Sequence, residues 1–174
     1  MNNDLSIRKL VGAALFAALI CVVTFAVAIP TPGGGYVNPG DAIILFSSWL
    51  LGPIWGAAAA GIGSSLADIL AGYAVYAPGT FIIKGVMGLV AGLLMQHHRS
   101  NLKMVIAVSV LTECIMIGGY FLYESLLLGI GSGAFAAIPG NCIQGLFSVA
   151  AGSVLILTLS KTPYIRRMLQ KSCK

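Results

Sequence analysis

The segment GGGYVNPGD, residues 33–41, is polar and rich in glycine, and long apolar runs flank it on both sides. Of the 174 residues, 58% are hydrophobic and only 9% are charged, and the mean hydropathy is +0.95. An ordinary soluble domain is about one quarter charged. The composition therefore predicts an integral membrane protein, in which segment 33–41 is a loop at the membrane surface.

Ten Lys and Arg residues against five Asp and Glu give a net charge of +5. The basic residues lie near the chain ends and in the segment 97–103, which is typical of a topology signal and not of a nucleic-acid-binding face. The tail 161–174 could also lie on anionic headgroups. We therefore expect the lipid bilayer as a partner and no nucleic acid.

Two features of the sequence imitate other signals. The apolar run 10–29 ends in Ala26-Val27-Ala28 like a cleavable leader, but it has the length of a membrane span, about 20 residues, and we take it as an uncleaved helix. The four cysteines and the pair His97-His98 lack metal-ligand spacing. We expect neither a disulfide nor a metal site.

Proline and glycine breaks divide the chain into six predicted helices within one membrane domain, 1–174. Their expected bounds are about 7–29, 42–51, 54–71, 78–96, 104–127 and 139–159. Segment 42–51 rises only about 15 Å as a helix, so it is a tilted or partial span of a core about 30 Å thick. The fold class is an all-α six-transmembrane-helix bundle.

Six helices place both termini on one side of the membrane. With cytoplasmic termini, every cation except Lys84 lies inside or close to the inner surface, which satisfies the positive-inside rule. The loop 33–41 then faces outward, together with the loops 72–79 and 129–133.

Polar residues concentrate in the outer half of this bundle. On the fifth helix Glu113, Tyr120 and Glu124 fall within about 40° of one another, and on the sixth Asn141 and Gln144 share a face with Ser148. Charged groups avoid lipid, so these stripes predict an outward-facing polar chamber that binds a small molecule. The candidate substrate-binding residues are Tyr36, Asn38, Asp41, Asp68, Tyr73, Tyr76, Lys84, Tyr120, Glu124, Asn141 and Gln144.

Purely structural roles are open for several of these residues. Lys84 could pair with Asp68 or a glutamate to fix helix packing, and Asn141 and Gln144 could be interhelical hydrogen-bonding groups. Asn38 and Asp41 could cap the second helix. The tyrosines could belong to an interfacial belt.

Phosphate-loop, zinc-hydrolase and dinucleotide motifs are absent from the sequence, so we expect neither an enzyme nor a nucleotide-driven motor in this chain.

Four motifs together resemble one family, the S components of energy-coupling factor (ECF) vitamin transporters. They are GYVNPGD at 35–41, LGP at 51–53, DILAGY at 68–73 leading to Lys84-Gly85, and IPGNCIQ at 138–144. Within that family the chain is most similar to the riboflavin-transporter-like group that includes the hydroxymethylpyrimidine and pyridoxine type.

The resemblance implies a bacterial plasma-membrane subunit that captures a small heterocyclic vitamin from outside. Its implied partners are a transmembrane coupling subunit of the EcfT type and two ATPase subunits, which use the ATP; no cofactor is expected in this chain. Toppling of the subunit in the membrane would deliver the cargo. Small residues of the first helix, Ala13 with Ala17 or Ala14 with Ala18, would contact the coupling subunit, although the residues alone equally fit packing within the bundle.

Three other functions compete with this interpretation. A stand-alone secondary transporter would use Glu113 and Asp68 as proton relays. An intramembrane enzyme would use the acidic residues for acid/base chemistry. A scaffold subunit would bind no ligand.

Pyridoxine or hydroxymethylpyrimidine is the expected cargo, ahead of riboflavin, because several tyrosines and mixed carboxylate, amide and ammonium groups suit a hydroxyl-bearing ring.

Overall fold

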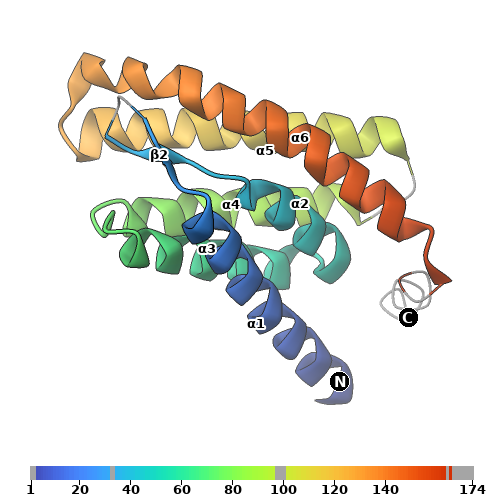
Figure 1. Ribbon diagram of the computed structural model, residues 1–174. Helices are drawn as coiled ribbons and strands as arrows, with labels where there is room; N and C mark the ends of the chain where they lie inside the picture. The colour runs from blue at the N-terminus through green and yellow to red at the C-terminus, as the bar shows by residue number, and fades with distance from the viewer. Residues whose placement is uncertain (1–2, 32–33, 97–100, 164, 166–174) are drawn as a thin grey trace.

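The computed structural model describes all residues except 1–2, 32–33, 97–100, 164 and 166–174, and the described chain is mostly helical (Figure 1). The α-helices are α1 (Asn3–Ala26), α2 (Gly40–Leu51), α3 (Pro53–Leu70), α4 (Ala77–Met95), α5 (Leu102–Leu122) and α6 (Ile138–Ser160). A π-helical turn, η1 (Tyr123–Leu127), continues α5, and a 3-10 helix, η2 (Gly131–Ala137), precedes α6. Two short strands, β1 (Ile29–Pro30) and β2 (Tyr36–Val37), complete the described elements.

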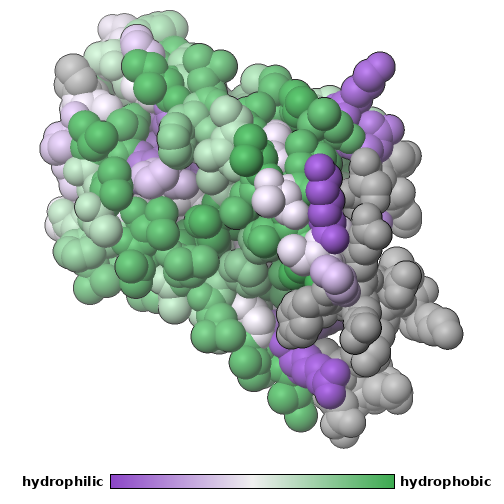
Figure 2. Space-filling view, turned by 45° about the vertical axis from the view of Figure 1, so that its right-hand side comes forward, coloured by the Kyte–Doolittle hydropathy of each residue, from purple (hydrophilic) through white to green (hydrophobic). Residues whose placement is uncertain are grey.

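Four helical segments of the described chain are long and apolar enough to cross a membrane. They are Ile7–Ala26, Ala77–Met95, Leu102–Leu127 and Gly131–Ser160. Their outer faces carry large exposed hydrophobic side chains such as Leu15, Ile82 and Leu146. Hydrophobic residues cover most of the visible surface, and strongly hydrophilic side chains gather along one edge (Figure 2). These properties are those of a membrane protein.

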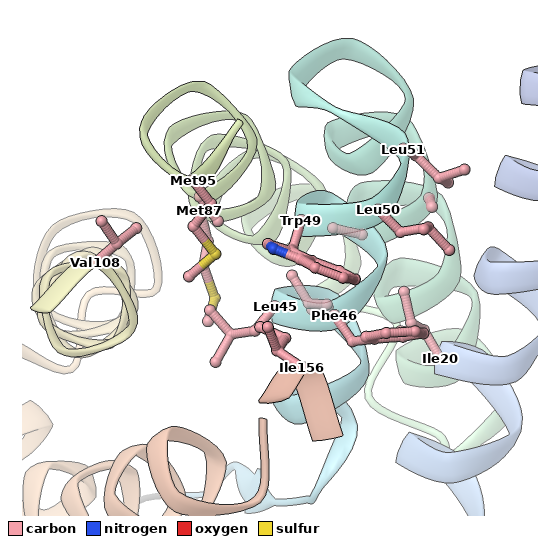
Figure 3. Close-up of a cluster of buried hydrophobic side chains, with 14 of the residues drawn as sticks. Ile20, Leu45, Phe46, Trp49, Leu50, Leu51, Met87, Met95, Val108 and Ile156 are labelled. Atoms are coloured by element: carbon pink, nitrogen blue, oxygen red, sulfur yellow. The ribbon is translucent and has the colours of Figure 1, made fainter. Parts of the chain in front are cut away.

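Helix α2 lies inside the bundle rather than at its surface. Eleven of its 12 residues are buried, and the helix packs against α1, α3, α4 and α6. Trp49 and Phe46 of α2 stack with their ring centroids 5.8 Å apart, between Ile20 of α1 and Met87 of α4 (Figure 3). A helix of this length rises about 18 Å, which is too short to cross a bilayer core of about 30 Å. Its apolar sequence is therefore explained by its central position in the bundle.

Small residues allow the helices around α2 to approach closely. A Cβ atom added to Gly63 of α3 would lie 2.5 Å from the Ala17 carbonyl oxygen of α1. One added to Gly88 of α4 would lie 2.9 Å from the Gly56 carbonyl oxygen of α3. Such contacts need residues without side chains, as is usual for helix pairs in lipid. The glycine- and alanine-rich sequence of α3 thus places it between α1 and α4.

The loops between helices are more ordered than the sequence indicated. Helix α1 ends at Ala26, and Ile29–Pro30 pairs with Tyr36–Val37 as an antiparallel hairpin, where the sequence predicted helix to residue 29 and then a glycine hinge. Pro30 lacks the amide donor that would continue the helix, and Gly34 adopts φ +87° in the turn. Likewise, part of the expected loop 129–133 belongs to η2.

The hairpin, the segment 72–76 and the η1–η2 region gather at one end of the bundle (Figure 1). The end of α4, the start of α5, the start of α1 and the end of α6 lie toward the other end (Figure 1). The elements that surround the predicted chamber are therefore assembled at a single end of the molecule.

Candidate functional site

A polar cavity lies beneath the hairpin, between α1, α3, α4, α5 and α6. The space open to the centres of water molecules is about 30 Å³, which is room for about two waters. Its walls contain three carboxylate or ammonium side chains, three amides and three tyrosines. The lining residues are Thr24, Thr31, Gly35, Tyr36, Asn38, Ser64, Asp68, Tyr76, Thr80, Lys84, Tyr120, Glu124, Ala137, Asn141 and Gln144.

A chain of polar contacts forms the floor of this cavity. Lys84 Nζ lies 2.5 Å from Asp41 Oδ1, and both side chains are almost completely buried. Gln144 Nε2 donates to the second Asp41 oxygen at 2.5 Å, and Gln144 Oε1 accepts from the backbone N–H of Asn38 at 2.8 Å. The Asp41–Lys84 pair connects α2 to α4, and the two Gln144 contacts connect α6 to Asp41 and to the segment that follows β2.

Four tyrosine rings form a row beside the cavity. The ring centroids of Tyr36 and Tyr73 are 4.8 Å apart, those of Tyr73 and Tyr76 6.3 Å, and those of Tyr76 and Tyr123 6.2 Å. The Tyr36 hydroxyl donates to Asp68 Oδ1 at 2.5 Å. Burial, together with the neighbouring Asp68 carboxylate, raises the pKa of Tyr36. Burial, together with Glu124, raises the pKa of Tyr76 to about 12.

Two carboxylate oxygens in the cavity wall lack a hydrogen-bond partner. Asp68 Oδ2 and Glu124 Oε2 are both buried, and neither oxygen makes a hydrogen bond. Asp68 is 3% exposed and Glu124 2%. A buried polar atom without a partner is costly, and a bound molecule with N–H or O–H groups would satisfy it. The wall is therefore built to receive hydrogen-bond donors.

The structure brings the predicted substrate-binding residues together. Those that line the cavity are Tyr36, Asn38, Asp68, Tyr76, Lys84, Tyr120, Glu124, Asn141 and Gln144. Asp41 lies behind the wall, where it holds Lys84, and Tyr73 lies outside it, against Tyr36. Whether these residues bind a ligand stays a prediction.

The cavity is also lined by residues outside the predicted substrate-binding set, among them Thr24, Thr31, Ser64 and Thr80. Thr80 precedes Lys84 by one helical turn, and its hydroxyl lies 2.9 Å from that of Tyr120. Ser64 precedes Asp68 by the same spacing. Residues one turn before a site residue share its helix face, and this signal was available in the sequence.

The partner of Lys84 is Asp41, where the sequence suggested Asp68 or a glutamate. The Asn38 side chain lines the cavity and accepts from the backbone N–H of Gly40, the first residue of α2, at 2.9 Å. The N-cap position of α2 is Pro39, which provides no side-chain cap, and ligand contact by Asn38 stays a prediction. Glu113 lies apart from the cavity lining. It is 3% exposed, and both its carboxylate oxygens lack hydrogen-bond partners.

The small residues of α1 fall on two different faces. Ala13 and Ala17 are buried, and Ala17 contacts Gly63 of α3. Ala14 and Ala18 are exposed.

Among the described residues, no group of three His, Cys, Asp or Glu side chains is placed to hold a metal ion. His97, His98 and the basic tail from residue 166 lie outside the described part of the chain.

Comparisons with known proteins agree on one family. Residues 4–161 match the family model described as "ECF-type riboflavin transporter, S component". The chain is 32% identical over 169 residues to the thiamine precursor transporter HmpT of Lactococcus lactis, an alignment that covers 96% of this chain and 92% of the relative. It is 34% identical over 143 residues to an "Uncharacterized protein in gap 3'region" of Pyrococcus woesei, covering 82% and 95% of the two chains. The chain therefore belongs to the ECF-type riboflavin transporter S-component family, a family of membrane transport proteins rather than enzymes, which act on a small-molecule vitamin together with membrane partner modules.

Proposed function

We propose that this S component binds a small heterocyclic vitamin or vitamin precursor at the polar cavity, on the extracellular side of the cell membrane. Hydroxymethylpyrimidine or pyridoxine is favoured over riboflavin. The observation that carries the proposal is the pair of buried carboxylate oxygens, Asp68 Oδ2 and Glu124 Oε2, that face the cavity without donors. Amino and hydroxymethyl groups on a small ring would supply those donors.

The dimensions of the cavity favour a small cargo. Its volume of about 30 Å³ is far below that of sites that enclose drug-sized ligands, which measure about 300 to 1,000 Å³. A single ring requires a smaller expansion than the three fused rings and polyol chain of riboflavin. The similarity to the thiamine precursor transporter of Lactococcus lactis also supports a pyrimidine cargo.

The tyrosine row provides the means to cover such a ring. Tyr36 and Tyr76 line the cavity, and Tyr73 lies between their rings. Aromatic side chains stack on heterocycles in offset or tilted geometry. The hairpin residues 34–37 and the segment 72–76 would move apart to admit the ligand and then close over it, so that Tyr36 and Tyr76 contact the bound ring.

Transport would require other subunits. The proposed complex contains a transmembrane coupling subunit and two ATPases, and the chain itself, with six membrane helices and both termini in the cytoplasm, needs no cofactor. Delivery would occur by toppling of the loaded subunit. Of the four predicted small residues of α1, Ala14 and Ala18 are exposed and form the proposed contact with the coupling subunit, whereas Ala13 and Ala17 pack inside the bundle.

Calorimetry on the purified protein with hydroxymethylpyrimidine, pyridoxine, riboflavin and thiamine tests the binding proposal. We expect at least one of the small ring compounds to bind with a dissociation constant well below millimolar. Asp68→Asn should weaken that binding at least about tenfold, because a charge-assisted hydrogen bond is worth about 1.5 to 3 kcal/mol. Ser65→Ala is the matched control on α3, since the Ser65 hydroxyl bonds to the Ile62 carbonyl instead of facing the cavity. Millimolar or weaker binding of the whole panel would reject the proposal.

Vesicle uptake separates ATP-coupled import from the alternative of a stand-alone proton-coupled transporter. Vesicles that contain this chain alone should bind the vitamin without accumulating it, whatever proton gradient is applied. Accumulation that requires a proton gradient and no ATP would favour the alternative, in which Glu113 and Asp68 relay protons.

A further inference from the structure

Only some of the charged side chains at the cavity have an oppositely charged partner. Among the described residues that line it, Lys84 is the lone cation, and Asp41 already neutralises it at 2.5 Å from behind the wall. Asp68 and Glu124 face the cavity without any such partner and carry unsatisfied oxygens. The wall therefore presents acceptors and no uncompensated positive charge to a bound molecule.

An anion in this cavity would be destabilised in two ways. Its charge would lose hydration without gaining a free cation, and burial of an unpaired charge is strongly unfavourable. It would also lie close to two carboxylates, whose repulsion is large where water is excluded. A phosphate ester carries a charge of about −1.5 to −2 at neutral pH, so it is the common vitamin derivative that this arrangement opposes most.

Lys84 cannot easily be released to bind a phosphate. Its partner Asp41 also accepts a hydrogen bond from Gln144, and Gln144 accepts one from the backbone N–H of Asn38. Moving Lys84 toward a ligand would leave Asp41 as a buried anion and disturb that chain of contacts. The ammonium also lies 5.4 Å from the centroid of the Tyr120 ring, which further restrains its position.

We infer that the cavity selects neutral or cationic, donor-rich heterocycles and rejects their phosphate esters, with Asp68 and Glu124 as the specificity-determining residues. The inference rests on the proposed function, because it concerns the same site. It adds that this subunit distinguishes a free vitamin alcohol from the phosphorylated form of the same ring. A reaction that phosphorylates the alcohol would therefore have to act after uptake.

Calorimetric titration of paired ligands tests this selectivity. The pairs are hydroxymethylpyrimidine with its monophosphate and pyridoxine with its 5′-phosphate, each measured on the full chain in detergent. We expect the phosphate ester to bind at least about a hundredfold more weakly than the alcohol, because two carboxylates oppose it. Glu124→Gln should reduce that ratio about tenfold or more, mainly by strengthening binding of the ester.

Glu113→Gln is the matched control, since it removes one buried carboxylate of the same helical stripe that does not line the cavity. It should leave the ratio unchanged. Equal affinity for ester and alcohol would overturn the inference while leaving the proposed function intact, and absence of binding by either member would reject both. If Glu124→Gln and Asp68→Asn leave the affinity ratio of alcohol to ester unchanged, the discrimination depends on ligand size. That result would also overturn the charge-based inference.

Discussion

At the scale of single residues, the site depends on which charges are paired. Asp41 and Lys84 satisfy each other inside the bundle, whereas Asp68 and Glu124 each keep one oxygen free for a ligand. The sequence identified Lys84, Asp68 and Glu124 by their position in apolar helices, where ionisable groups usually have a function, and Asp41 by its position at the end of the polar loop 33–41. It could not identify the pairing, because pairing depends on how α2 is placed relative to α4.

The Asp41–Lys84 pair should show strong coupling in a double-mutant cycle. Asp41→Asn leaves a buried ammonium without its counter-ion, and loss of one partner of a buried pair costs about 3 to 5 kcal/mol. Lys84→Met leaves a buried carboxylate in the same way. The double variant should be less destabilised than the sum of the two by at least about 1 kcal/mol. Unfolding in detergent, monitored by fluorescence, measures all four proteins, and additive effects would show that the pair contributes no coupling.

Tyr76 should keep its proton, and its contact with the ligand, at moderately alkaline pH. The pKa of Tyr76 is about 12, so its hydroxyl stays protonated where an ordinary tyrosine ionises, near about pH 10. Ligand affinity should therefore be constant from about pH 7 to 10. Because the unfolded chain loses this proton first, Tyr76 should make folding stability fall as the pH rises from about 10 to 12.

Comparison of the wild-type protein with Tyr76→Phe measures both effects. Tyrosinate absorbance assigned to Tyr76 by difference should develop only above about pH 11, and the melting temperature of the wild type should fall more steeply than that of the variant in that range. A Tyr76 signal below about pH 10 would contradict the burial described here.

At the scale of helices, close packing decides the arrangement around α2. The contact of Gly63 with the Ala17 carbonyl brings α1 onto α3, and Gly56 with Gly88 brings α4 onto its other side. The sequence predicted the six helices within a few residues of their bounds, because apolar runs bounded by Pro and Gly are local signals. The hairpin β1–β2 was missed, since two residues per strand carry no detectable alternation.

Adding one methyl group at the α1–α3 contact should destabilise the bundle. Gly63→Ala places a Cβ atom 2.5 Å from the Ala17 carbonyl oxygen, so the helices must separate; overpacking of this kind costs about 1 to 3 kcal/mol. Gly118→Ala on α5 is the control, because nothing lies within 4 Å of its added Cβ atom. Thermal unfolding should show a lower midpoint for Gly63→Ala alone. Equal midpoints for the two variants would mean that α1 does not pack this tightly.

At the scale of the whole molecule, the polar cavity and the exposed small residues of α1 have separate tasks in the proposed mechanism. The cavity lies at the end of the bundle where the hairpin and the segment 72–76 gather, whereas Ala14 and Ala18 lie on the outer face of α1. Binding and docking should therefore be separable by mutation.

Ala14→Leu and Ala18→Leu should abolish vitamin uptake by the complete transporter while leaving the affinity of the isolated subunit unchanged. Bulky side chains prevent the close helix contact that small residues permit. Ala107→Leu is the matched control, an exposed alanine of α5 in the same membrane environment. Uptake assays with the reconstituted complex and co-purification with the coupling subunit measure the effect. Normal uptake by both α1 variants would place the docking surface elsewhere.

The sequence by itself determined the membrane character, the approximate helices and most of the residues that line the cavity, because these follow from composition and from the periodicity of one helix at a time. Only the tertiary structure decided that α2 lies at the centre, that Asp41 and not Asp68 neutralises Lys84, and that Ala13 and Ala17 face inward while Ala14 and Ala18 do not. The segment 33–41 likewise proved to contain part of a hairpin tied to α6 through Asn38 and Gln144. The physical reason is the same in each case: partners more than 40 residues apart in sequence meet only when several helices pack together, and helical phase alone does not specify which faces meet.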